Sequence, residues 1–153
     1  MKYPNLEKLV DIIAVLRSEN GCEWDREQTH KSLRPNMLEE AYEAVDAIDE
    51  GDISNLREEL GDVLLQVVLH AQIAKDDGEF DIEDVAKELS DKLIHRHPHV
   101  FGNTEVHSTQ EILDNWDKLK KEEKTYRKSV LDGISKSQSA LMSAQKISKK
   151  VVK

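Results

Sequence analysis

Cysteine, proline, glycine and aromatic residues are all scarce in this sequence of 153 residues. The single cysteine, Cys22, excludes an intramolecular disulfide and a cysteine-rich zinc site, which favours a reducing compartment. Only three prolines and six glycines interrupt the chain, and apolar and polar residues rarely alternate strictly. Both features predict an all-α fold rather than a sheet.

Long apolar segments and an excess of positive charge are also missing. No apolar run approaches the roughly 18 residues of a membrane span, and residues 1–10 lack the pattern of a secretion signal. We therefore expect no membrane partner and a cytoplasmic location. The 31 acidic residues outnumber the 22 basic ones, for a formal charge of −9. Nonspecific nucleic-acid binding requires clustered Lys and Arg, so we expect no nucleic-acid partner.

The apolar content is low for a self-contained core. Hydrophobic residues make up 38% of the chain and aromatic residues 5%, whereas 35% are charged. This composition supports amphipathic helices but leaves little apolar surface for a core in a single chain. We therefore predict that the fold is completed by dimerisation, as a homodimer.

Apolar residues recur at helical spacing in five segments, which predicts a bundle of four to five helices. The expected helices cover about residues 6–16, 37–50, 55–74, 82–96 and 109–127. Asn55, with Glu58 three residues later, is the expected N-cap of the third helix. Residues 1–127 are expected to form the helical domain, and residues 128–153 a basic tail.

Two pairs of acidic residues occupy similar places on the second and third predicted helices. Glu40 and Glu43 lie one turn apart beside an apolar stripe, and Glu59 and Asp62 do the same on the next helix. The short connection at residues 51–54 predicts an antiparallel hairpin, which would bring the four carboxylates together. Such a group repels itself unless cations lie between its members. Oxygen ligands alone favour Mg²⁺, with Mn²⁺ as an alternative.

The pattern of these acids allows two other interpretations. Acid pairs on helices are commonly solvated faces with basic partners, but Arg57 is the only basic residue near these acids in the sequence. A di-iron carboxylate site requires Glu-x-x-His steps on two helices. Neither predicted helix contains such a step. The residues therefore favour a non-redox divalent cation.

Several motifs surround these acids: WDREQTH at residues 24–30, ELGDVLLQVV at 59–68, RHPHVF at 96–101 and NW at 115–116. Together with the acids, they make residues 6–124 resemble the MazG family of nucleoside triphosphate pyrophosphohydrolases. The family pattern Glu-Glu-x-x-Glu, followed by Glu-x-x-Asp, is matched by Glu39, Glu40 and Glu43 and by Glu59 and Asp62. Many members carry two tandem repeats, and the sequence resembles the first. Residues 128–153 are then either a basic C-terminal tail or the start of an absent second repeat.

The resemblance implies an all-α enzyme that cleaves nucleoside triphosphates between the α and β phosphates. It implies Mg²⁺ ligands at Glu40, Glu43, Glu59 and Asp62. It also implies nucleotide contacts from Lys92, Arg96, Trp116 and Lys120. Without the resemblance, Lys92 and Arg96 are an ordinary surface pair with acidic neighbours, and Trp116 either packs against the core or stacks on a base.

The acids exceed those needed to bind one cation, which suggests a general base among them. Glu39 ranks slightly ahead of Glu58 as the acceptor of a proton from the attacking water. The predicted products are a nucleoside monophosphate and pyrophosphate. The alternative is a helical dimerisation or regulatory module that binds nucleotide but is catalytically weak.

Overall fold

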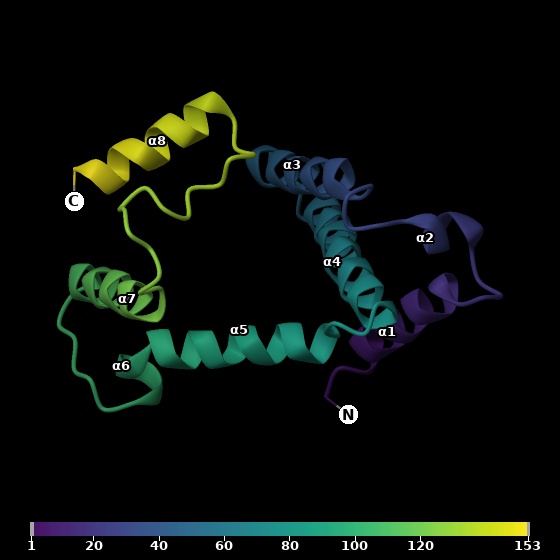
Figure 1. Ribbon diagram of the computed structural model, residues 1–153, viewed down its shortest axis with the longest axis horizontal. Helices are drawn as coiled ribbons and strands as arrows, with labels where there is room; N and C mark the ends of the chain where they lie inside the picture. The colour runs from purple at the N-terminus through teal and green to yellow at the C-terminus, as the bar shows by residue number, and fades with distance from the viewer. Residues whose placement is uncertain (1, 153) are drawn as a thin grey trace. The chain divides into compact units, whose positions relative to one another are not determined.

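The computed structural model describes residues 2–152, and this range contains eight helices and no strands (Figure 1). They are α1 (Pro4–Arg17), α2 (Glu23–Glu27), α3 (Arg34–Glu50), α4 (Ile53–Asp76), α5 (Ile82–Arg96), α6 (Pro98–Phe101), α7 (Thr109–Glu123) and α8 (Ala140–Val151). The all-α prediction is confirmed. The chain divides into two compact units, Met1–Leu89 and Ser90–Lys153. Among the described residues, no helix has the length and apolar character to cross a membrane.

The five predicted helices correspond to α1, α3, α4, α5 and α7, but some of their ends were wrong. Helix α3 begins at Arg34 rather than near Met37, because Pro35 falls in its first turn, where no backbone N–H is needed. The N-cap of α4 is Asp52 rather than Asn55. The Asp52 carboxylate accepts a hydrogen bond of 3.0 Å from the backbone N–H of Asn55. The predicted cap therefore lies inside the first turn.

The last part of the chain contains a helix that the sequence analysis described only as a tail. Helix α8 begins after Ser139, whose side chain accepts a hydrogen bond from the backbone N–H of Met142. Helix α7 ends at Glu123 and not at Arg127. The intervening segment has no regular helix longer than a turn among its described residues.

Helices α3 and α4 form the antiparallel hairpin that the short connection predicted (Figure 1). Gly51 ends α3 with a φ of 71°, in the left-handed region, and its N–H bonds back to the carbonyls of Ala47 and Ile48. A residue with a Cβ would be strained there by about 1 kcal/mol. Ala44 and Ala47 are buried on α3. These small side chains let the backbones of the two helices approach closely.

The hydrophobic core of the first unit lies toward the C-terminal half of α4. It consists of Ile13, Leu33, Val68, Leu69 and Ile73, with Leu9, Val10, Leu16, Leu65 and Ile82 packed around it. Helix α1, the segment before α3, α4 and the start of α5 all contribute. The acid-bearing N-terminal half of α4 lies outside this cluster, so the core supports the hairpin from one end.

Much of the apolar stripe on α3 and α4 is exposed in the single chain. On α3 the exposed side chains include Leu38, Tyr42, Val45 and Ile48; on α4 they include Leu60, Leu64 and Val67. The spacing of four, three and three residues on α3, and of four and three on α4, is helical, so each helix presents a continuous stripe. Patches of this kind are uncommon on monomeric proteins and mark interaction surfaces.

Two histidines attach the segment before α3 to α4. Nδ1 of His30 and Nδ1 of His70 lie 2.7 Å apart, and the rings stack with centroids 5.0 Å apart. One Nδ1 must donate a proton to the lone pair of the other. Burial, and then the neighbouring His30, lowers the pKa of His70 below its usual value. His70 is therefore neutral in the folded protein near neutral pH.

The lowered pKa of His70 predicts a loss of stability in mild acid. The unfolded chain titrates this histidine near its usual pKa of about 6.5 and binds more protons than the folded chain just below that pH. The free energy of unfolding should decrease as the pH falls from about 6.5 toward the folded pKa. In denaturant unfolding across this pH range, the free energy of unfolding should change less steeply with pH for His70→Gln than for the wild type. The same change at exposed His107 should preserve the wild-type slope; equal slopes for both variants would contradict the assignment.

Candidate metal centre

Three glutamates from the two hairpin helices bring their carboxylates together. Glu40 and Glu43 project from α3 and Glu59 from α4, and one oxygen of each lies within 4.8 Å of the others. Glu40 and Glu59 are half-buried, whereas Glu43 is exposed. Oxygens bound to one Mg²⁺ at about 2.1 Å lie roughly 3–4 Å apart. Small side-chain rotations would therefore allow the three groups to share an ion.

Asp62, the fourth predicted ligand, is close enough to act on both half-buried glutamates. Desolvation raises the pKa of Glu40, and the charges of Asp62, Glu43 and Glu39 raise it further. The pKa of Glu59 is likewise raised by desolvation, and then by Glu43, Asp62 and Glu58. These carboxyls hold their protons more tightly than usual because they are desolvated and because negative charge is concentrated around them. A divalent cation would reverse that effect.

The two candidate bases flank this group. Glu39 and Glu58 are exposed neighbours of Glu40 and Glu59, and each contributes repulsion to its neighbour's carboxyl. Both are accessible to solvent, and their charges are felt at the cluster. The geometry does not favour one over the other, and the choice of base stays a prediction.

The residues expected to contact nucleotide belong to the second unit. The guanidinium of Arg96 lies 5.7 Å from the centre of the Trp116 ring, a cation–π contact. His97 meets the same ring edge-on, with centroids 4.6 Å apart. Trp116 is half-buried between them. Both roles left open for Trp116, packing and stacking on a base, stay predictions.

The two predicted lysines also lie in this unit. Nζ of Lys120 is 3.7 Å from a carboxylate oxygen of Asp117, three residues earlier on α7. Lys92 lies one turn before Arg96 on α5 and is half-buried. Their contact with nucleotide stays a prediction, as does the ligand set of the metal.

Sequence reasoning missed one partner of this group, Glu123. Arg96 donates hydrogen bonds to both carboxylate oxygens of Glu123. The two residues are 27 positions apart, on different helices, so no local pattern could pair them. The one available signal was the position of Glu123 near the predicted end of a helix, where a carboxylate is disfavoured by the helix dipole.

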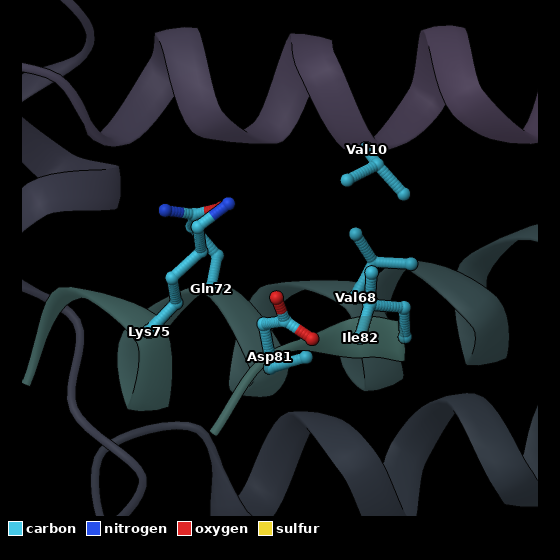
Figure 2. Close-up of a pocket in the computed structure, with 7 residues that line it drawn as sticks. Val10, Val68, Gln72, Lys75, Asp81 and Ile82 are labelled. Carbon is cyan, nitrogen blue, oxygen red and sulfur yellow. The ribbon is translucent and has the colours of Figure 1, made fainter. Parts of the chain in front are cut away.

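The first unit also contains a small pocket beside its hydrophobic core. Figure 2 shows Val10 of α1, Val68, Gln72 and Lys75 of α4, and Asp81 and Ile82 around it. None of the predicted metal, catalytic or nucleotide residues lines it. The pocket is a gap beside the hydrophobic core, and it contains no side chain predicted to bind the metal or the nucleotide.

The fold and the acidic centre together define a class: helical proteins in which a hairpin of two helices presents carboxylates for a divalent cation. Residues 28–101 match the model of the MazG nucleotide pyrophosphohydrolase domain. The match contains the whole hairpin. A crystal structure of a MazG-related protein from Thermotoga maritima is 31% identical, with a TM-score of 0.63, over 75% of this chain and 98% of that one. The chain belongs to the MazG family.

Curated relatives extend the similarity over more of the chain. The nucleoside triphosphate pyrophosphohydrolase/pyrophosphatase MazG of Thermotoga maritima is 54% identical over 80% of this chain. The nucleoside triphosphate pyrophosphohydrolase of Escherichia coli is 47% identical over 95% of it. The aligned regions cover 47% and 56% of those two proteins. The chain therefore spans about half the length of these relatives.

The concentration of negative charge predicts that a divalent cation stabilises the fold. Adding Mg²⁺ or Mn²⁺ at neutral pH should raise the melting temperature, because the ion binds the folded hairpin and relieves its repulsion. Glu59→Gln should reduce the increase. Glu50→Gln removes one charge at the exposed end of α3, outside the cluster, and should retain it. Equal increases for the two variants, measured by thermal unfolding, would argue against the ligand set.

Proposed function

We propose that this chain hydrolyses nucleoside triphosphates between the α and β phosphates, with Mg²⁺, to a nucleoside monophosphate and pyrophosphate. The observation that carries the proposal is the meeting of the Glu40, Glu43 and Glu59 carboxylates within 4.8 Å on one hairpin. That hairpin lies inside the matched nucleotide pyrophosphohydrolase domain. The names of the relatives from two bacteria support the same reaction.

The residues present fit a divalent cation. Glu40, Glu43, Glu59 and Asp62 supply only oxygen donors, the type that Mg²⁺ and Mn²⁺ prefer. When bound, such an ion neutralises phosphate charge and lowers the pKa of water. Holding it is the role we assign to these four carboxylates, and the raised pKa of Glu40 and of Glu59 supports that role.

The remaining residues have separate tasks in this proposal. Glu39, or in its place Glu58, accepts the proton of the attacking water. Lys92, Arg96 and Lys120 bind the phosphates and offset the charge that develops on the departing pyrophosphate. Trp116 holds Arg96 by its ring and contributes to the wall of the nucleotide site. No covalent intermediate is needed.

The reaction is tested by product analysis. With Mg²⁺ and a panel of NTPs and dNTPs, the wild-type chain should release pyrophosphate and a monophosphate, whereas cleavage at the γ phosphate would release inorganic phosphate. Glu59→Gln should lower turnover by at least about a hundredfold, because even outer-shell partners of metal ligands contribute tenfold to hundredfold. Glu50→Gln should remain active. Undiminished turnover in Glu59→Gln would exclude the proposed metal centre.

The second candidate is a dimerisation or regulatory module that binds nucleotide without useful catalysis. It is favoured by the exposed apolar stripes of α3 and α4, which are typical of interaction surfaces. Binding of the same nucleotides without any product would establish it. Turnover by the wild-type chain would exclude it.

We also propose that the chain forms a homodimer through the exposed stripes of α3 and α4. The side chains of Val45 and Ile48 on α3 are 50% and 58% exposed, and that of Leu60 on α4 is 53% exposed. A second copy of the same hairpin would cover them with a surface of equal apolar character and form a four-helix bundle.

Sedimentation velocity at micromolar concentration tests the dimer. The wild-type chain should sediment as a dimer, and Ile48→Lys should shift it toward the monomer because a charge would be buried in the interface. Val15→Lys is the matched control, since Val15 is 64% exposed on α1, away from the stripes. A folded wild-type monomer at this concentration would contradict the assignment.

A further inference from the structure

Arg96 is held on two sides by side chains of α7. Its Nε donates to Oε1 and Oε2 of Glu123, both at 3.2 Å, and its Nη2 donates to Oε2. Trp116 lies against the guanidinium at 5.7 Å from its ring centre. Only 10% of the Arg96 side chain is exposed, and 24% of the Glu123 side chain. The guanidinium plane is therefore fixed before any ligand arrives.

The position of Glu123 is poor for helix stability. It is the last residue of α7, where the helix dipole disfavours a negative charge. Even so, the pKa of Glu123 is lowered, first by the hydrogen bonds from Arg96 and also by the charge of Arg96. His95 adds a weaker contact, with Nε2 at 3.7 Å from Oε1. The carboxylate is thus kept in place by the arginine rather than by its own helix.

The pairing leaves Arg96 able to bind a second anion. A guanidinium has five N–H donors in a planar fork. Glu123 is bound by two nitrogens, Nε and Nη2. One N–H on each of these is engaged, so three of the five donors remain, on Nη1 and Nη2. A phosphate oxygen pair can be bound through that end of the fork without breaking the Glu123 bonds.

We propose that Glu123 is a positioning residue that orients Arg96 toward the triphosphate. The inference rests on the proposed function, in which Arg96 binds phosphate, and adds a residue that none of the family motifs includes. Glu123 does not touch the substrate. It acts by fixing the fork of Arg96, so that less conformational entropy is lost when the phosphate binds.

Competition between Glu123 and phosphate for Arg96 would change the phosphate affinity of a Glu123 variant in the opposite direction. If the carboxylate competed with phosphate for the same N–H groups, removing it would tighten binding. The low exposure of Arg96 argues against such competition, because exchanging a half-buried partner would leave Glu123 charged and unpaired. Positioning therefore predicts weaker binding when the carboxylate is removed.

Magnesium triphosphate, a probe without base or sugar, tests the inference by calorimetry. Glu123→Ala should weaken binding about tenfold, the lower end of the range for a hydrogen bond to a charged group. Arg96→Ala should weaken it at least as much. The double variant should match Arg96→Ala alone, because Glu123 acts through Arg96. In turnover assays, kcat/KM should fall at least about tenfold, because Arg96 both binds the phosphates and offsets the charge that develops on the departing pyrophosphate.

Matched variants separate positioning from folding. Glu122→Ala removes the adjacent, exposed carboxylate of α7 and should bind like wild type. Glu123→Gln keeps the shape and one acceptor, and should lie between wild type and Glu123→Ala. Unchanged or tighter binding of magnesium triphosphate by Glu123→Ala would overturn the inference. So would a double variant that binds about tenfold more weakly than Arg96→Ala alone. A wild-type chain that binds the probe but releases no pyrophosphate would sink the proposed function alone, since the binding series still reports on Glu123.

Discussion

Repulsion among carboxylates on the α3–α4 hairpin is the constraint on which the rest of the molecule depends. The short turn at Gly51 and the buried alanines bring the helices together, and the spacing of the acids then forces like charges to share one region. In the part of the chain that the structure describes, no ion pair joins a basic side chain to Glu40, Glu43 or Glu59. Desolvation, together with the neighbouring negative charges, raises the pKa of Glu40 and Glu59. A concentration of negative charge of this kind repels anions and attracts cations.

The predicted metal ligands and the predicted phosphate-binding residues lie in different compact units of the chain. The acids lie in the unit that ends at Leu89, and the basic residues expected to contact phosphate lie in the unit that begins at Ser90. Within the second unit, Arg96 is hydrogen-bonded to Glu123 and makes a cation–π contact with Trp116. Each of the two groups therefore has its own supporting contacts within its own unit.

Sequence reasoning predicted the helices and the acid cluster for the same reason. Both depend on patterns that are local in the sequence. Glu40 and Glu43 share a face of one helix because they are three residues apart. The short connection predicted at residues 51–54 requires the next helix to run antiparallel to the first. Sequence reasoning failed where chemistry is decided by residues distant in sequence. The pairings of Arg96 with Glu123 and of His30 with His70 cross 27 and 40 residues. Helix ends were missed for a third reason, since Asp52 and Asn55 are equally acceptable caps and only the backbone selects Asp52.

The buried methyl groups of Ala44 and Ala47 have a further consequence. Each lies one turn beyond an acid, Ala44 after Glu40 and Ala47 after Glu43, so they set the separation of the helix axes beside the carboxylates. An alanine side chain is a single methyl group without alternative rotamers, so neither residue can change its shape to alter the distance between the two helices. The backbone, rather than any adjustable side chain, therefore sets how near the two acid-bearing helices lie at this point of the hairpin.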